Sequence, residues 1–325
     1  MRIIDTHTHG IGGYDTRTAD VDHILRIAEI HGSYEVSEIL LTIYPSTIRV
    51  MRENMEIIKR AMGKQGIRVN YPVNRSQFQP QASGNPPIHP LERGDKGGFE
   101  KEGREGINQP AKIIGVHLEG PFLNPAKCGA LNAMAFIEPA EYAFDELIEG
   151  FESIVRIISV APEMSGAVGL IKKMSDKGII VSMGHSDATY AEADAGFHAG
   201  AKGITHIFNA MRGLHHREPG IAGFALLNGD IYIEVIADPF HLHPKTLDLI
   251  FRTKNPDKII IISDTVKETK ADGSKERGIS DTYGNLLGGS LTIAESSNRL
   301  IAMGHNEEVI KSCITTNPGV YLSAR

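Results

Sequence analysis

Short apolar runs alternate with longer amphipathic stretches along most of the chain. Eight of these runs have the length and apolar content of buried strands. They lie at residues 2–6, 37–43, 112–118, 155–160, 179–183, 203–205, 231–237 and 258–262. The pattern therefore predicts eight strands, the first of which begins almost at residue 1.

Stretches with helical periodicity follow most of the predicted strands. They lie at residues 21–30, 48–62, 141–151, 165–177, 190–199, 244–251 and 307–314. Strand and helix alternating over roughly 250 residues is the pattern of a parallel (β/α)8 barrel, the TIM barrel. A doubly wound open sheet is the competing α/β fold. We expect the barrel, as a single domain over residues 1–325.

One stretch interrupts the alternation. Residues 74–109 are rich in glycine, proline, glutamine and alternating charges, and include Pro86-Pro87 and Gly97-Gly98. A connection of this length without structure of its own is uncommon inside a compact domain. We expect a flexible insertion at 74–109, with a lid or a contact segment as the alternative. Residues 282–292, which carry two glycine-containing turn signals, are expected to form a loop after the last strand.

Composition narrows the class of protein. The 325 residues are 41% hydrophobic, enough for a buried core, and the net charge of −6 is mild for this length. Neither nucleic acid nor a membrane is expected as a partner, and no apolar run approaches the roughly 20 residues that span a bilayer. The start of the chain lacks the pattern of a secretory signal, so a cytoplasmic location is expected. Cys128 and Cys313 are too far apart in sequence to suggest a disulfide framework or thiolate-bound zinc.

Residue types that bind metals stand where predicted strands end. In a barrel, the loops that follow the strands gather at one mouth, so these side chains are expected to converge. They are His7, His9, Glu119, His185, His206 and Asp264. A single histidine at a strand end is more often structural, but six such residues after five strands favour a metal site. His117 is expected to be a packing or supporting residue, because Glu119 already occupies the end of its strand.

Imidazole and carboxylate together suit zinc or another divalent first-row metal. The absence of thiolate favours a catalytic ion with an open position over a closed structural site. Such an ion lowers the pKa of bound water to about 7. Asp264 is then a candidate to take the proton of that water and hand it to a leaving group.

Sequence motifs around these positions resemble the N-acetylglucosamine-6-phosphate deacetylases of the amidohydrolase superfamily. The matching segments are His7-Thr8-His9-Gly10, Gly115-Val116-His117-Leu118-Glu119-Gly120-Pro121-Phe122, Ala161-Pro162-Glu163, Gly184-His185-Ser186-Asp187-Ala188, Thr205-His206-Ile207-Phe208-Asn209-Ala210-Met211 and Ser263-Asp264. The match as a whole runs in order from residue 3 to about residue 320. The Leu-Glu-Gly-Pro-Phe and His-x-Phe-Asn-Ala-Met segments together distinguish this family from other metal-dependent barrels.

The resemblance implies a hydrolase that removes the acetyl group from N-acetylglucosamine 6-phosphate, giving glucosamine 6-phosphate and acetate. Glu119, His185 and His206 match the main metal triad of the family. His7 and His9 match the pair that supports a second metal in members that have it, and other members work with one ion. Zinc is the favoured metal, and iron, manganese and cobalt suit the same ligands. Asp264 matches the aspartate that transfers the proton.

The resemblance also implies the residues that hold the substrate. Asn209 and Ala210 match residues that bind the sugar phosphate, and Arg217 matches an arginine that pairs with the phosphate. A guanidinium fork suits a phosphate better than a point charge does. His241 matches a further histidine that contacts the substrate. Family members are commonly homodimers that complete the phosphate pocket across their interface, so a homodimer is expected.

Two departures from the family concern the substrate and the architecture. Leu131 stands where the family usually has a histidine that helps to hold the substrate. Either His215 or His216 supplies that contact, or the substrate differs from the usual sugar. Typical members also carry segments at both ends that form a small β-sandwich, and we expect a bare barrel that lacks it.

Two rival functions remain open at this point. The first keeps the hydrolase chemistry but changes the substrate to another N-acyl amino sugar or a cyclic amide. The reason for this alternative is that Leu131 replaces the family histidine. The second is a non-catalytic barrel that uses the polar insertion to bind a partner. The full ligand set argues against the second, and metal analysis of the purified protein discriminates between them.

Overall fold

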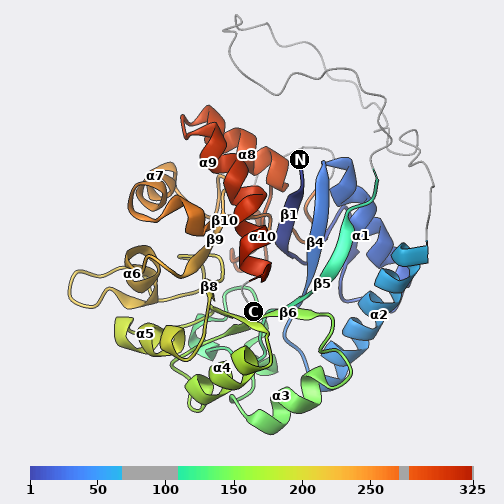
Figure 1. Ribbon diagram of the computed structural model, residues 1–325, viewed down its shortest axis with the longest axis horizontal. Helices are drawn as coiled ribbons and strands as arrows, with labels where there is room; N and C mark the ends of the chain where they lie inside the picture. The colour runs from blue at the N-terminus through green and yellow to red at the C-terminus, as the bar shows by residue number, and fades with distance from the viewer. Residues whose placement is uncertain (68–108, 271–277, 324–325) are drawn as a thin grey trace, which may run out of the picture.

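A parallel sheet of eight strands forms the centre of the protein (Figure 1). The computed structural model describes residues 1–67, 109–270 and 278–323. The sheet order is β1-β4-β5-β6-β7-β8-β9-β10. The strands are β1 (Ile3–Thr8), β4 (Val36–Ile43), β5 (Lys112–Leu118), β6 (Val155–Val160), β7 (Ile180–Met183), β8 (Gly203–Ile204), β9 (Tyr232–Ile236) and β10 (Ile259–Ile262).

The order of the strands decides between the two expected folds. A doubly wound sheet reverses its order at a switch point, whereas here each strand pairs with its successor in the chain. The first and last strands are also joined, because the Asp264 amide donates to the His7 carbonyl over 2.9 Å. The Ser263 hydroxyl donates to the Asp5 carboxylate over 2.5 Å at the same seam. The expected (β/α)8 barrel is confirmed.

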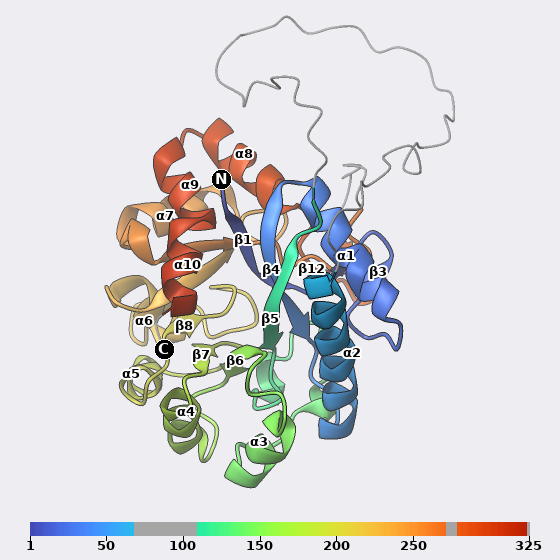
Figure 2. The same ribbon diagram turned by 45° about the vertical axis from the view of Figure 1, so that its right-hand side comes forward.

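Helices surround the barrel on its outer side (Figure 2). They are α1 (Val21–Ser33), α2 (Ile48–Ile67), α3 (Glu141–Ile148), α4 (Ala167–Asp176), α5 (Tyr190–His198), α6 (Gly220–Leu227), α7 (Pro244–Thr253), α8 (Ile293–Ala302), α9 (Glu307–Ile314) and α10 (Thr316–Ser323). The helices other than α10 pack their apolar faces against the outer faces of the strands and form the larger of two cores, whereas α10 covers one end of the barrel. Each connecting loop after a strand is thereby directed to one mouth.

The interior of the barrel has its own small apolar core at the end remote from that mouth. Helix α10 contacts β1 and β10. It places Tyr321 and Leu322 among the inward side chains Ile4, Leu40 and Ile260. Tyr321 packs on Tyr232 with the ring centroids 4.9 Å apart. Above this core the inward side chains become polar and lead to the mouth.

Some elements of the structure differ from the sequence prediction, and helices α6, α8 and α10 are not among the predicted stretches. Helix α6 was not predicted, because its sequence is apolar on every side and lacks the periodicity of a surface helix. Helix α8 was also not predicted, although Thr292 and Glu295 form a capping box at its start. The expected loop at 282–292 contains strand β12 (Leu286–Gly288), paired with β11 (Ile279–Ser280).

Outside the barrel sheet, the described residues contain only two small ribbons. One is β11–β12 and the other pairs β2 (Gly10–Ile11) with β3 (Tyr14–Asp15). The β-sandwich of the family is thus not among the elements described. The predicted insertion at 74–109 lies outside the described residues except for residue 109. A search of the described helices for one long and apolar enough to traverse a bilayer finds none.

Candidate metal centre

Three side chains from different strand ends converge at the mouth. One oxygen of Glu119, Oε1, lies 3.1 Å from Nε2 of His185 and 3.0 Å from Nε2 of His206. The two imidazole nitrogens are 3.2 Å apart. Ligand atoms bound at 2.0–2.2 Å in a tetrahedral site are separated by roughly 3.4 Å. The triad therefore has the spacing of a set of ligands around one cation.

A second group lies against the first. His7 and His9 place Nε2 atoms 3.4 and 3.7 Å from Oδ1 of Asp264. The other oxygen of Glu119, Oε2, lies 3.1 Å from Nε2 of His9. Glu119 thus presents Oε1 to the triad and Oε2 to His9, which is the arrangement of a carboxylate between two cation positions.

The local backbone explains how these residues reach the mouth. His185, His206 and Asp264 have positive φ angles of 46°, 30° and 49°. Each follows the last residue of its strand by two positions, so the left-handed conformation ends the strand and turns the side chain inward. Non-glycine residues adopt this region rarely and at a cost of about 1–3 kcal/mol, and they cluster at functional sites.

Hydrogen bonds behind two of the histidines fix their rings. Nδ1 of His185 donates to the Lys127 carbonyl over 2.9 Å, which leaves Nε2 free to act as an electron-pair donor. Nδ1 of His7 lies 3.3 Å from Oε2 of Glu234, and the other oxygen of that carboxylate accepts from Thr6 over 3.1 Å. Histidines that bind metals usually have such a partner on the second nitrogen.

Glu234 is a functional candidate that the sequence reasoning missed. It is buried in the middle of β9, and it is the only charged residue of that strand. Burial raises its pKa. A lone acid inside an otherwise apolar strand is the signal that would have found it.

Several ring nitrogens at the centre are buried without a hydrogen-bond partner. They include Nε2 of His7, Nδ1 of His9 and Nδ1 of His206. Nε2 of His7 points between Glu119 and Asp264, 3.6 and 3.4 Å from their oxygens. Because a buried polar atom without a partner is costly, an unpaired lone pair aimed at two carboxylates fits a bound cation.

The ring of His9 is held by stacking instead of a hydrogen bond on Nδ1. It stacks on Tyr44 with the centroids 3.8 Å apart, and the Arg17 guanidinium lies 4.0 Å from the same Tyr44 centroid. Two groups this close occupy opposite faces of the ring, so Tyr44 is clamped between them. Arg17 is in turn fixed by Asp15 through bonds of 3.0 and 2.7 Å.

The two carboxyl groups of the centre have opposite pKa shifts. Burial would raise the pKa of Glu119, but hydrogen bonds from His185, His206 and His9 outweigh it and hold that pKa well below its usual value. Burial, reinforced by the negative charges of Glu119 and Glu234, raises the pKa of Asp264 well above its usual value. The first shift favours a carboxylate anion suited to ligation, and the second favours a carboxyl group that carries a proton.

His117 lies deeper in the barrel than the triad. Its Nε2 bonds to the Ser159 hydroxyl over 2.8 Å and its Nδ1 lies 3.2 Å from the Thr6 carbonyl. The ring also packs edge-on against His7 with the centroids 4.5 Å apart. Both nitrogens thus have partners in the barrel wall, in agreement with the expected packing role. Together with His7 and Glu234 it also forms a further group of clustered ligand types.

A cavity of about 240 Å³ opens above the candidate centre. Asn209, Ala210 and His241, the residues that the resemblance assigns to the substrate, line it. Nδ1 of His241 is bound to Asp238 over 2.9 Å, so its Nε2 remains available to a ligand. Leu131 also lines the cavity and presents an apolar wall where the family has a histidine.

Arg217 is the predicted substrate residue that the structure leaves outside this cavity. It lies on an exposed loop, where its guanidinium bonds to Nε2 of His216 over 2.9 Å. His215 and His216 are exposed on the same loop and do not line the cavity either. Within this chain, neither histidine replaces the contact that Leu131 cannot make.

The fold and the converging ligands define a (β/α)8 barrel with a candidate metal centre at its mouth. In comparisons with known proteins no family model matches the chain. It is 36% identical over 194 residues to an N-acetylglucosamine-6-phosphate deacetylase of Vibrio furnissii, covering 56% of this chain and 48% of the relative. It is also 36% identical over 157 residues to an N-acetylgalactosamine-6-phosphate deacetylase of Escherichia coli O157:H7, covering 48% and 41%. The chain thus spans about half the length of the curated relatives it matches.

A comparison with solved structures also finds a match to the fold of this chain. It is an N-acetyl-D-glucosamine-6-phosphate deacetylase variant from Mycobacterium smegmatis in complex with N-acetyl-D-glucosamine-6-phosphate. The TM-score is 0.76 at 22% identity, covering 99% of this chain and 77% of that one. The chain is related in sequence to the N-acetylglucosamine-6-phosphate deacetylases and has their barrel fold, and the resemblance found in its motifs is confirmed.

Proposed function

We propose that this chain is a metal-dependent hydrolase that removes the acetyl group from N-acetylglucosamine 6-phosphate. The observation that carries the proposal is the meeting of Glu119, His185 and His206 at ligand spacing, with the proton-carrying Asp264 beside them. The products are glucosamine 6-phosphate and acetate. The reaction is proposed for the cytoplasm.

The donor set fits a divalent cation, with zinc the favoured metal and iron, manganese or cobalt as alternatives. Glu119, His185 and His206 would hold the first ion. His7 and His9, with Glu119 between, would hold a second ion. A divalent cation bound there supplies a Lewis acid that polarises the amide carbonyl and makes water nucleophilic at neutral pH.

Asp264 is proposed to move the proton in this reaction. Its carboxylate oxygen faces the centre at 3.4 Å from Nε2 of His7, so it is within reach of a water that enters between the two groups. Burial and neighbouring negative charge raise its pKa, which increases its affinity for the proton of that water. The same carboxyl group then delivers the proton to the departing amine nitrogen. Without this delivery the amine is a poor leaving group.

Asn209, Ala210 and His241 are proposed to hold the sugar phosphate. All three line the cavity on the side of β8 and β9, which sets the direction of the substrate. Arg217 is proposed to pair with the phosphate of a substrate bound in a second copy of the chain. Its exposed position outside the cavity of its own chain supports a homodimer that completes the phosphate site.

Acetate release from N-acetylglucosamine 6-phosphate by the purified protein, together with its metal content, tests the proposal. We expect turnover with about one or two ions per chain, lost on treatment with a chelator and restored by Zn²⁺. Glu119→Gln removes an anionic ligand with little change in volume, and we expect it to lose both metal and activity. Well under one ion per chain together with no turnover would favour the non-catalytic barrel.

A second candidate keeps the chemistry and changes the sugar or the acyl group. Leu131 favours it, because leucine cannot donate the hydrogen bond that the family histidine makes to the substrate. A panel of N-acetylated glucosamine and galactosamine, with and without the 6-phosphate, discriminates between the two candidates. A cyclic amide hydrolysed faster than every sugar would overturn the deacetylase assignment.

A further inference from the structure

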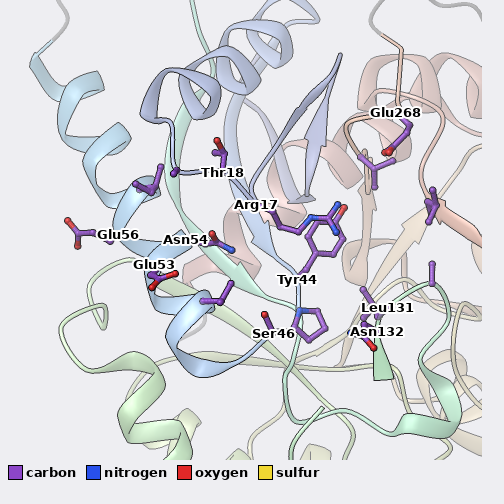
Figure 3. Close-up of a pocket in the computed structure, with 17 residues that line it drawn as sticks. Arg17, Thr18, Tyr44, Ser46, Glu53, Asn54, Glu56, Leu131, Asn132 and Glu268 are labelled. Carbon is purple, nitrogen blue, oxygen red and sulfur yellow. The ribbon is translucent and has the colours of Figure 1, made fainter. Parts of the chain in front are cut away.

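A second and larger cavity lies beside the one above the candidate metal centre (Figure 3). Its volume is about 850 Å³, more than three times the 240 Å³ of its neighbour. Loops after β1, β4, β5 and β10, together with helix α2, form its walls. Tyr44, Ala130, Leu131 and Leu287 line both cavities, so the two adjoin along these residues.

The larger cavity lies on the far side of the metal centre from the residues that hold the sugar phosphate. Tyr44 follows β4, whereas Asn209 and Ala210 follow β8. These strands are four apart in a ring of eight, so their ends are on opposite sides of the mouth. An amide of this kind is planar and trans, which directs its two substituents in opposite directions. With the sugar on the β8 side, the acyl substituent points to the β4 side.

The walls of the larger cavity indicate the chemistry of that substituent. The boundary with the metal centre is apolar at Leu131 and Leu287, and Val50 and Ile57 of α2 continue the apolar surface. Apolar walls of this kind bind a hydrocarbon chain at about 0.8 kcal/mol, or about fourfold in affinity, for each methylene removed from water.

The charged residues of the lining exclude a negative substituent. Glu53, Glu56 and Glu268 line the cavity, and the one basic residue of its lining, Arg17, is neutralised by Asp15. Figure 3 shows Arg17 lying along the ring of Tyr44, with Glu53 and Glu56 displayed from α2. A carboxylate at the end of an acyl chain would therefore meet like charge without a free cation among these residues.

From these features we propose that the larger cavity is an acyl subsite, which lets the enzyme act on amino-sugar phosphates whose neutral N-acyl chains are longer than acetyl. The proposal rests on the proposed hydrolase function. Leu131 is the specificity-determining residue at the boundary, because an apolar side chain there lines the path of the chain. Tyr44, clamped between His9 and Arg17, fixes the opposite wall.

Four substrates test the proposal: glucosamine 6-phosphate carrying N-acetyl, N-butyryl, N-hexanoyl or N-succinyl groups. We expect kcat/KM to rise by about fourfold per methylene from acetyl to butyryl, and to stay at least tenfold above acetyl for hexanoyl. Succinyl has a backbone as long as butyryl but ends in a carboxylate. We expect its kcat/KM to be no higher than that of the acetyl substrate.

A variant that narrows the larger cavity tests whether the chain-length preference arises there. Val50→Trp fills the α2 wall without touching the metal centre, and Val168→Trp makes the same change on the exposed side of α4 as a matched control. We expect Val50→Trp to lower kcat/KM for the hexanoyl substrate by tenfold or more and to leave the acetyl substrate within about twofold. The retained acetyl activity shows that the variant is folded, and Val168→Trp should alter neither value.

The outcomes separate this proposal from the function on which it rests. If no N-acyl amino-sugar phosphate is hydrolysed, the proposed function is wrong. If the acetyl substrate is hydrolysed and the longer neutral chains are at least tenfold poorer, the function stands and the acyl subsite is wrong. A chain-length preference that survives unchanged in Val50→Trp would also overturn the assignment of this cavity.

Discussion

The histidine rings at the mouth of the barrel are oriented by the residues that contact them from the side away from the candidate metal centre. Nδ1 of His185 donates to a backbone carbonyl, and Nδ1 of His7 lies beside the buried carboxyl group of Glu234. The ring of His9 stacks on the ring of Tyr44. The sequence motifs located the histidines but not Glu234 or Tyr44. These supporting residues lie elsewhere in the chain, and only the closed barrel brings them into contact.

Asp264→Asn separates proton transfer from ligation. The amide is nearly the same size but cannot accept and release a proton, so we expect kcat to fall by about 10²–10⁴-fold. The triad of Glu119, His185 and His206 is untouched, so at least one ion per chain should remain. Metal analysis and acetate release on the same preparation provide the measurement. A variant with more than a tenth of the parent kcat would assign the proton to another group.

Glu234→Gln tests the support behind His7. The change keeps the shape and one hydrogen bond but removes the negative charge that Nδ1 of His7 faces at 3.3 Å. We expect metal affinity at the His7–His9 position to fall by about 10–100-fold. Competition with a chelator, followed by counting the ions retained, measures it. Glu152→Gln, on an exposed loop, is the matched control and should retain the parent affinity.

Elements of regular structure were predictable where an alternating pattern was strong. The strands at 112–118 and 155–160 and the helix at 307–314 have the predicted bounds. Helix α6 was not predicted because a helix that is buried on nearly all sides has no polar face, and the helical periodicity of its sequence is lost. Helical periodicity thus reports how a helix meets solvent, and it says little about a helix that is buried on nearly all sides.

Helix α1 gives a prediction about pH. His31 is buried against β1, with Nε2 3.1 Å from the Thr8 hydroxyl, and burial lowers its pKa to about 4. The unfolded chain, with an ordinary pKa near 6.5, therefore binds this proton first as pH falls. The stability contribution is complete above about pH 6.5 and is lost progressively toward pH 4. The loss amounts to about 2 kcal/mol by pH 5.

Urea unfolding at pH 7 and pH 5 measures this contribution. His31→Leu should be less stable at pH 7, because the hydrogen bond to Thr8 is lost, but its free energy of unfolding should fall less steeply with pH than that of the parent. His198→Leu removes an exposed histidine and should follow the parent. Equal slopes for the parent and His31→Leu would contradict the assignment.

For the molecule as a whole, the sequence indicated the barrel and the group of histidine and carboxylate side chains that meet at its mouth. The motifs did not indicate the large acyl cavity, because its walls come from four loops and a helix that no single motif contains. They also left open how Arg217, which is exposed and does not line the cavity, reaches a phosphate. That question concerns the assembly of copies, which a single chain does not display.

A mixing experiment tests the shared phosphate site. Arg217→Ala should raise KM for the phosphorylated substrate by about 10–100-fold, the loss of a charged hydrogen bond, and leave the unphosphorylated sugar unchanged. Arg217→Ala and Asp264→Asn are each impaired alone. If the arginine serves the partner, refolding them together should restore a fraction of the parent activity, since some mixed dimers contain one intact site. If Arg217→Ala keeps the parent's preference for phosphorylated substrates, Arg217 does not bind the phosphate.

Tyr321 and Leu322 close one end of the barrel, and this limits the routes by which water and products can pass. With that end packed, the described interior offers no tunnel, so water enters and both products depart through the same portal. Under the proposed function, acetate is released on the side of the larger cavity, away from the sugar, so it can leave while the sugar is still bound. Kinetic inhibition patterns by acetate and by the free amine would therefore report the sequence of departure directly.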